Sequence, residues 1–231
     1  MREAQLGRKL YPITTMNIRI LLADDHDIVL RGLRALIEAQ PGMEVCGEAS
    51  NGRIAVQLAD QLKPDIIIMD VGMPELNGFE ATRQIRRAQP KVAILVLSMH
   101  QSDQLVREVL AAGARGYMLK SDAGRDLVGA ITLLAAGGTF LSPSVAKAAK
   151  RAGVQTTPKR PGRRAAGGLT QREHEILQLL AEGQSNKSTA SSLGISVKTV
   201  ETHRARIMNK LAIKSLADLV RYAVRNHIIE P

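Results

Sequence analysis

Five polar residues in the first half of the chain stand directly after short apolar runs. They are Asp24, Asp25, Asp70, Ser98 and Lys120. Because ligands of a parallel sheet bind at the carboxyl ends of its strands, we expect these side chains to converge. Carboxylates of this kind suit Mg²⁺, while a lysine and a hydroxyl would stabilise the oxygens of a transferred phosphoryl group. A carboxylate nucleophile would then form an acyl phosphate.

Each of these residues alone has a simpler explanation. An aspartate after a strand is most often a helix cap or a turn residue, and a lone lysine is usually a solvated charge. Five such residues at the ends of four predicted strands are much harder to assign to chance. The pattern therefore favours a pocket that accepts a phosphoryl group.

The elements that would position this pocket are apolar runs that alternate with amphipathic stretches. The predicted strands are Ile18–Ala23, Met43–Ala49, Ile66–Met69, Val92–Leu97 and Gly116–Leu119. The predicted helices are Ile28–Ala39, Arg53–Leu62, Gly78–Ala88, Asp103–Ala112 and Ala123–Ala136. Near-continuous Ile, Val and Leu runs indicate strands that are buried on both faces. The expected fold is α/β, a doubly wound sheet of five parallel strands.

The net charge of +10 lies entirely in the C-terminal part of the chain. Residues 1–140 hold 16 basic and 16 acidic residues, whereas residues 141–231 hold 16 basic residues against 6 acidic ones. This asymmetry points to a polyanionic partner for the C-terminal part alone. Residues 157–164 (TPKRPGRR) contain no apolar anchor, which is typical of a flexible basic linker.

These patterns divide the chain into four segments. We expect an N-terminal extension (1–16), an α/β domain (17–140), a basic flexible linker (141–168) and a small all-α domain (169–231). Residues 1–15 are interpreted as a disordered extension or an over-long gene prediction, and they lack the apolar segment of a signal peptide. No apolar run is long enough to span a membrane, and the single cysteine, Cys46, fits a cytoplasmic location.

The C-terminal segment has the pattern of a helix-turn-helix. Its predicted helices are Glu173–Ala181, Lys187–Leu193, Val197–Leu211 and Leu216–Asn226. Thr170 stands three residues before Glu173, which is the spacing of a capping box, and Ser196 can cap the third helix. Two helices joined by a short turn that contains Gly194 are typical of a helix-turn-helix.

The third of these helices has a face that suits DNA. Val200, Ile207 and Leu211 form an apolar stripe, and cationic and small polar residues lie on the other side. Such a face suits a helix inserted in a major groove. The alternative is an ordinary solvated amphipathic helix, but the preceding turn and the basic linker favour DNA.

The first domain resembles the receiver domains of two-component response regulators over about 120 residues. The motifs are residues 24–26 (DDH), 69–78 (MDVGMPELNG), 97–98 (LS) and 113–120 (GARGYMLK). The resemblance implies that Asp70 is phosphorylated and that Asp24, Asp25, Asp70 and the backbone carbonyl of Gly72 hold Mg²⁺. It also implies that Ser98 and Lys120 contact the phosphoryl group while Tyr117 changes rotamer. The alternative for Tyr117 is an ordinary half-buried tyrosine.

The C-terminal segment resembles the LuxR-type helix-turn-helix of NarL/FixJ-type regulators over about 60 residues. The motifs lie in residues 169–177 (LTQREHEIL), 183–187 (GQSNK) and 195–203 (ISVKTVETH). The resemblance implies that Lys187, Lys198, Thr199 and His203 mainly hold phosphates, and that Glu201, Thr202, Ala205 and Arg206 face base edges. Residues 188–190 (STA) depart from the family, since Thr189 replaces an aliphatic residue and should loosen packing by about 1 kcal/mol. The last helix would mediate dimerisation, or it merely closes the core.

The expected function is that of a DNA-binding response regulator rather than an enzyme. A sensor histidine kinase would phosphorylate Asp70, and a homodimer would then grip a two-fold symmetric double-stranded DNA site. One alternative is a phosphohydrolase, but Gly72 stands where such an enzyme typically carries a general acid. Another is a receiver that dimerises without phosphorylation, which the intact pocket disfavours.

Overall fold

The computed structural model describes residues 17–99, 103–143, 145–146, 169–226 and 228–229. The predicted extension and most of the predicted linker lie outside these residues. The first domain has the following strands: β1 (Ile18–Ala23), β2 (Met43–Ala49), β3 (Ile66–Asp70), β4 (Ala93–Ser98), β5 (Gly116–Leu119) and β6 (Phe140–Leu141). Its helices are α1 (Asp27–Glu38), α2 (Gly52–Leu62), α3 (Gly78–Ala88), α4 (Asp103–Ala112), the 3₁₀ turn η1 (Lys120–Asp122) and α5 (Ala123–Ala135).

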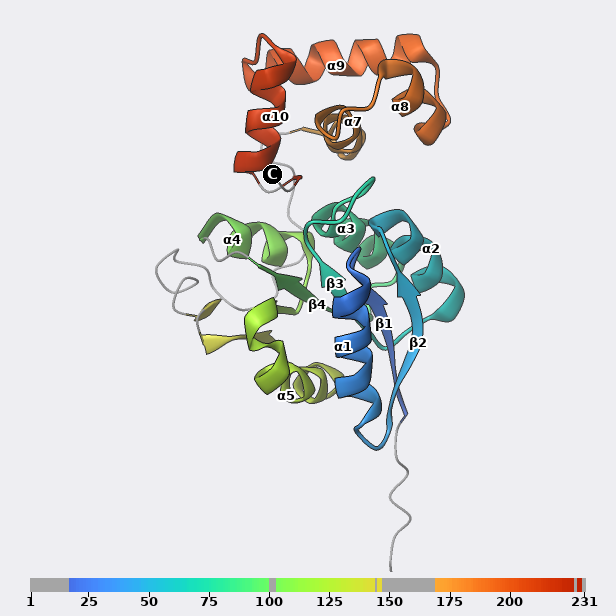
Figure 1. Ribbon diagram of the computed structural model, residues 1–231, viewed down its shortest axis with the longest axis vertical. Helices are drawn as coiled ribbons and strands as arrows, with labels where there is room; N and C mark the ends of the chain where they lie inside the picture. The colour runs from blue at the N-terminus through green and yellow to red at the C-terminus, as the bar shows by residue number, and fades with distance from the viewer. Residues whose placement is uncertain (1–16, 100–102, 144, 147–168, 227, 230–231) are drawn as a thin grey trace, which may run out of the picture.

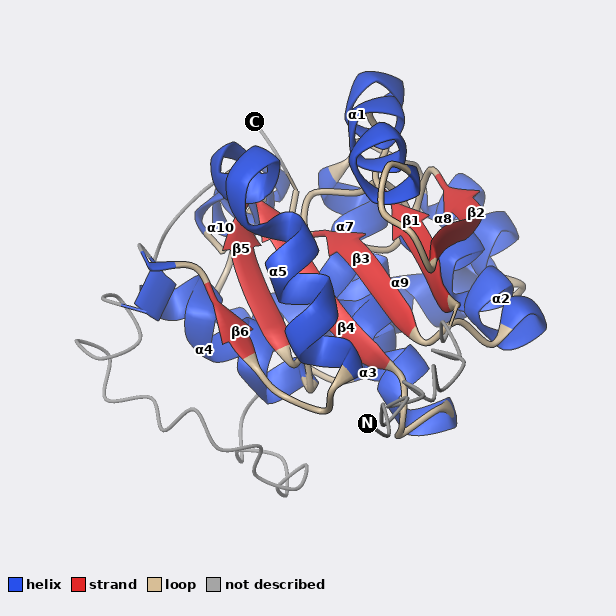
Figure 2. Ribbon diagram, turned by 90° about the horizontal axis from the view of Figure 1, so that it is seen from below, coloured by secondary structure: helices blue, strands red, loops and turns tan. Residues whose placement is uncertain are grey.

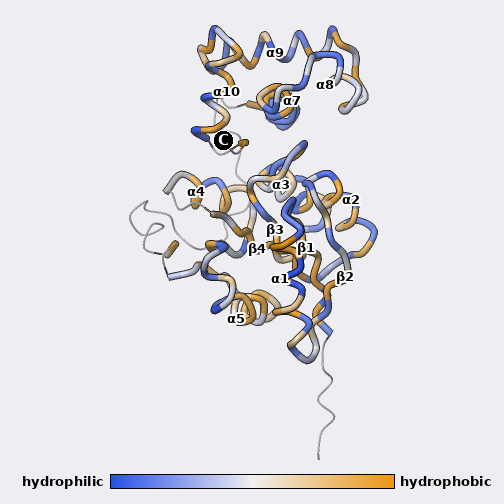
Figure 3. Tube along the Cα trace, viewed as in Figure 1, coloured by the Kyte–Doolittle hydropathy of each residue, from blue (hydrophilic) through white to orange (hydrophobic). Residues whose placement is uncertain are grey.

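These elements form a parallel sheet with a layer of helices on each side (Figures 1 and 2). The strand order is β2-β1-β3-β4-β5-β6, and every pair is parallel. Residues of α2, α3 and α4 pack on one face of the sheet, and residues of α1 and α5 pack on the other. Because β3 and β4 are buried on both faces, their sequences are almost entirely apolar, as the hydropathy of the trace shows (Figure 3). The doubly wound fold is confirmed.

The number of strands differs from the prediction, because the sheet has six strands and not five. The additional strand, Phe140–Leu141, pairs with β5 at the edge of the sheet. It has only two residues, both half-buried, so it leaves no periodic pattern in the sequence. Packing also continues beyond it, since Val145 is fully buried in the core beneath α2, α3 and α4.

The C-terminal segment consists of four helices around a separate core. They are α7 (Gln171–Ala181), α8 (Asn186–Leu193), α9 (Val197–Leu211) and α10 (Leu216–Arg225). The predicted capping box is present, because Thr170 accepts from the Glu173 amide and the Glu173 carboxylate accepts from the Thr170 amide. Ser196 caps α9, and Gly194 ends α8 in the left-handed conformation at φ 62°.

Thr189 lies in the interior of this domain. Its side chain is fully buried, and its hydroxyl has no hydrogen-bond partner among the described residues. A buried hydroxyl without a partner loses its hydration and gains nothing in return. This is consistent with the cost that was predicted for this departure from the family pattern.

Among the helices of the described residues, none is long and apolar enough to cross a membrane.

We predict that Thr189→Val stabilises the C-terminal domain by about 1 kcal/mol, because valine keeps the volume and removes the unpaired hydroxyl. The urea midpoint followed by circular dichroism should rise. Thr170→Val is the matched control, and it should lower the urea midpoint because it removes a helix cap that contributes about 1 kcal/mol. A lower midpoint for Thr189→Val would show that the hydroxyl is satisfied.

Candidate functional site

Lys120 draws together the carboxylates at the ends of two strands. Its Nζ lies 2.8 Å from Asp24 Oδ2 and 2.9 Å from Asp70 Oδ1. Asp24 follows β1, Asp70 ends β3 and Lys120 follows β5, so the strand order brings all three to one edge of the sheet. Asp24 and Asp70 are almost fully buried, and Lys120 is nearly so. Three of the residues singled out from the sequence therefore form one compact charged cluster.

Burial and the neighbouring Asp24 raise the pKa of the Asp70 carboxyl. Burial is the main cause that raises the pKa of Asp70 to about 6, and the neighbouring Asp24 adds to it, while Lys120 opposes the shift. Burial alone would lower the pKa of Lys120, but the Asp70 and Asp24 carboxylates outweigh burial and raise it. The ammonium therefore stays charged and holds the two carboxylates in place. A cation at this site would favour the ionised, nucleophilic form of Asp70.

The donor set fits a hard divalent cation. Asp24, Asp25 and His26 offer ligand atoms within 4.8 Å of one another, and Lys120 connects Asp70 to the same cluster. His26 Nδ1 lies 2.9 Å from Asp25 and 3.2 Å from Asp24, and these carboxylates, Asp25 first, raise the pKa of the imidazole. Because the two carboxylates engage His26 Nδ1, the donors that remain for a metal ion are carboxylate oxygens. Oxygen donors are the ligands that Mg²⁺ prefers.

Ser98 and Tyr117 lie in the interior beside this cluster. Ser98 ends β4 and is 3% exposed, and Tyr117, in β5, is fully buried. The Tyr117 phenol hydrogen-bonds to Ser98, and burial outweighs this bond and raises the pKa of the phenol. Tyr117 is therefore fully buried and not half-buried, and its hydroxyl is hydrogen-bonded to Ser98.

The loop after β3 is shaped by two close backbone approaches. The Gly72 amide donates to Asp70 Oδ2 at 3.2 Å, and the Gly78 amide donates to the Val71 carbonyl at 3.0 Å. A Cβ at position 78 would collide with the Asp70 carbonyl, so only glycine fits there. The loop is thus packed tightly against the backbone of Asp70.

The predicted DNA-contacting residues form an exposed surface around α9. Exposed among them are Lys187, Lys198, Glu201, Thr202, Ala205 and Arg206, while Thr199 and His203 are partly exposed. The opposite side of α9 carries Val200 and Ile207, which are fully buried in the core of the domain. In Figure 1, α9 lies along the side of this domain that faces away from the first domain. The helix therefore presents its predicted contact face to solvent.

The position of α10 agrees with the interpretation that this helix closes the core of its domain, and it is compatible with dimerisation as well. Leu219 and Ala223 are fully buried, so α10 does close the core. Leu216, at its first turn, is 44% exposed.

Two features of the structure were not predicted from the sequence. His26 lies between the two acidic side chains at the end of β1, although no role was assigned to it; its adjacency to Asp25 was the available signal. Gln178 of α7 hydrogen-bonds to the backbone of the loop that follows Asp70. No local pattern in the sequence indicates a contact between residues so far apart.

Comparison with known proteins agrees with this architecture. Residues 20–132 match the model of the response regulator receiver domain, and residues 168–223 match that of the bacterial regulatory proteins of the luxR family. The chain is 40% identical to the transcriptional regulatory protein LiaR of Bacillus subtilis, over 92% of this chain and 99% of LiaR. It is 34% identical to the response regulator protein VraR of Staphylococcus aureus, over 93% of this chain and all of VraR.

Solved structures with both domains are also similar. The RcsB response regulator of Salmonella typhimurium matches with a TM-score of 0.62 and 27% identity, over 91% of this chain and 98% of RcsB. An RcsB–DNA complex matches with a TM-score of 0.55 and 28% identity, over 89% of this chain and 97% of that one. The chain therefore belongs to the response regulators of two-component systems that join a receiver domain to a LuxR-type helix-turn-helix and regulate transcription by binding DNA.

Proposed function

We propose that Asp70 accepts a phosphoryl group from a sensor histidine kinase and that the receiver thereby controls the DNA-binding domain. The observation that carries this proposal is the buried Lys120 ammonium held between Asp24 and Asp70. In this role an Asp70 oxygen attacks phosphorus, the phosphorus–nitrogen bond of the phosphohistidine breaks, and the kinase imidazole leaves. The product is an acyl phosphate on Asp70.

The surrounding residues have distinct roles in this step. Asp24, Asp25, Asp70 and the Gly72 carbonyl would hold Mg²⁺, which neutralises charge on the transferred oxygens. Lys120 is placed to exchange its ion pair with Asp70 for one with the new phosphoryl group. The Ser98 hydroxyl would donate a hydrogen bond to the same group. Tyr117, which is hydrogen-bonded to Ser98, would change rotamer as that hydroxyl moves.

In the C-terminal domain, α9 would enter the major groove of double-stranded DNA. Lys187, Lys198, Thr199 and His203 would mainly hold phosphates, and Glu201, Thr202, Ala205 and Arg206 would face base edges. The exposure of this surface and the opposite apolar stripe support the assignment. A homodimer that forms on phosphorylation, with α10 at the contact, would bind a two-fold symmetric site.

We assign the extension to residues 1–16, the receiver to 17–140, the linker to 141–168 and the DNA-binding domain to 169–231; the first linker residues, as far as Val145, pack on the receiver. The protein works in the cytoplasm. It contacts no membrane. It does not turn over a substrate as an enzyme, because Gly72 places no acidic group two residues after Asp70 to protonate a leaving group.

We predict that incubation with Mg²⁺ and acetyl phosphate adds one phosphoryl group to the wild type and none to Asp70→Asn. Intact-mass spectrometry measures the adduct, and size-exclusion chromatography of the same samples should show a shift toward dimer for the wild type alone. Asp60→Asn is the matched control, because Asp60 is exposed on α2 and should be labelled normally. A wild type that stays unlabelled while a known receiver is labelled would refute phosphorylation at this pocket.

We also predict that Lys198→Gln weakens binding to duplex DNA and lowers the slope of log affinity against log salt by about 1, because one phosphate contact is lost. Fluorescence anisotropy at several salt concentrations measures both quantities. Lys63→Gln is the control, since it removes the same charge from an exposed site on the receiver. Equal losses for the two variants would indicate a general charge effect and not a contact by α9.

A further inference from the structure

Glu201 places a negative charge on the face of α9 that is proposed to contact DNA. It lies in the second turn of the helix, and its side chain is exposed. The residues around it on this face that carry a charge, Lys198 and Arg206, are cations. Because DNA is a polyanion, a carboxylate at this position is repelled by the phosphates unless it meets a hydrogen-bond donor.

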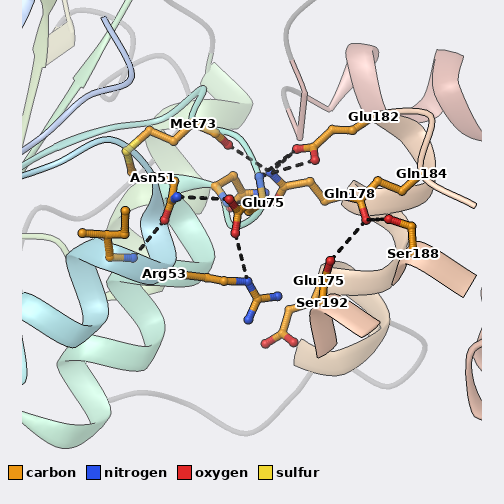
Figure 4. A network of polar contacts seen from close by, with 12 residues as sticks. Asn51, Arg53, Met73, Glu75, Glu175, Gln178, Glu182, Gln184, Ser188 and Ser192 are labelled. Atoms are coloured by element: carbon orange, nitrogen blue, oxygen red, sulfur yellow. Dashed lines mark hydrogen bonds and ion pairs between the residues drawn. The ribbon is translucent and has the colours of Figure 1, made fainter. Parts of the chain in front are cut away.

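Glu201 differs from the other acidic residues of its domain because it has no partner. Among the residues that the structure describes there, each other acidic side chain has one: Glu173 pairs with Lys210, Glu175 with Arg172 and Asp218 with Arg221, and Glu182 accepts from Gln178 (Figure 4). Glu201 makes neither an ion pair nor a hydrogen bond with any described residue.

Two cations stand at the right spacing to pair with Glu201, and neither does. Lys198 lies three residues before it and Arg204 three residues after it. The same spacing supports an ion pair in α7, where Arg172 lies 2.8 Å from Glu175. The carboxylate of Glu201 is therefore left free to accept a hydrogen bond from a ligand.

The charge of Glu201 contributes little to the stability of the helix itself. A carboxylate interacts favourably with the helix dipole in the first turn, and the effect falls off within that turn. The first turn of α9 holds no acidic residue, and Ser196 already caps it through the Thr199 amide. The simplest alternative is a solvated charge, which would have no effect on the choice of DNA sequence.

The neighbours of Glu201 along the helix suit a base edge better than a phosphate. Val197 and Ala205 stand one turn before and one turn after it, so the three side chains form one row. Val197 is 39% exposed, and Ala205 is exposed and short, which allows close approach of the helix to the bases. Because this row contains no cation, it has nothing with which to bind a phosphate.

The chemistry of the major groove limits what an ionised carboxylate can bind there. Guanine and thymine present acceptors, and the only base donors are the amino groups of cytosine and adenine. At adenine, the amino group stands beside the N7 acceptor, which would repel the second carboxylate oxygen. Cytosine presents its amino group without an acceptor of its own beside it. A free carboxylate on this face therefore fits cytosine.

We propose that Glu201 makes the protein select DNA sites with a cytosine in each half-site, by accepting a hydrogen bond from the cytosine amino group. This inference rests on the proposed function, in which α9 enters the major groove. The carboxylate gains a donor at cytosine and meets acceptors at the other bases, so it also penalises incorrect sequences. The cations of this surface attract any duplex, and Glu201 discriminates between duplexes.

The first experiment selects binding sites from duplexes with about 25 randomised base pairs, a length that covers two half-sites one helical turn apart. The full chain, incubated with Mg²⁺ and acetyl phosphate, binds this library, and the bound duplexes are sequenced. Wild-type sites should share a cytosine in each half-site. With Glu201→Ala, this position should lose its preference while the other positions keep theirs.

The second experiment measures affinities by fluorescence anisotropy, with a selected duplex and with the same duplex carrying T·A in place of that C·G pair. The wild type should prefer C·G roughly tenfold, as expected for one base contact, and Glu201→Ala less than about twofold. Glu201→Ala should also bind an unrelated duplex more tightly, because the repulsion is removed.

Glu201→Gln is the second variant, and it separates the charge from the hydrogen bond. Its amide can accept from the adenine amino group and donate to N7, so the preference at this position should shift toward adenine. Asp60→Ala is the matched control, because it removes the same charge from an exposed position on the receiver and should change neither affinity nor preference.

Three outcomes would overturn the proposal. An unchanged base preference in Glu201→Ala would show that Glu201 is a solvated charge. Tighter binding to every duplex with discrimination intact would show that the carboxylate only repels DNA. Loss of a preference for a base other than cytosine would show that the assigned contact is wrong. Failure of the proposed function looks different, because neither the wild type nor any variant would then bind duplex DNA.

Discussion

The buried ion pairs of Lys120 with Asp24 and Asp70 are the interaction on which the rest of the structure depends. Carboxylates removed from water are unstable unless a partner compensates them. One ammonium serves both, and it can do so only if β1, β3 and β5 end at the same edge of the sheet. The parallel, doubly wound arrangement supplies that edge. The apolar strands and the charged pocket are therefore two consequences of one topology.

The same constraint extends into the backbone that follows Asp70. Gly78 lets α3 begin directly against the Asp70 carbonyl, and Asn77 caps that helix. Glu75 is held in the left-handed region by Asn51, which caps α2, and by Glu182, which follows α7. The loop is thus fixed from three directions: the reactive carboxylate, the neighbouring helix and the second domain. Any movement of this loop would therefore break one of these contacts.

Charge is distributed differently in the DNA-binding domain. Its buried acidic residues are paired internally, since Lys210 lies 2.7 Å from Glu173 and Arg172 lies 2.8 Å from Glu175. Among the described residues, Lys187, Lys198 and Arg206 around α9 are exposed. Residues 1–140, by contrast, hold equal numbers of basic and acidic residues. This separation directs a polyanion toward one domain only.

The sequence by itself determined the elements and the pocket residues, because periodicity and chemical type are local properties. Strand ends placed Asp24, Asp70, Ser98 and Lys120 together, and caps such as Thr170 and Ser196 located helix starts. The two-residue strand β6 was missed, because its pairing with β5 arises only once the sheet exists. The tertiary structure alone decided the contact of Gln178 with the loop that follows Asp70. That contact joins residues about one hundred positions apart through backbone groups, which every residue carries and no sequence pattern records.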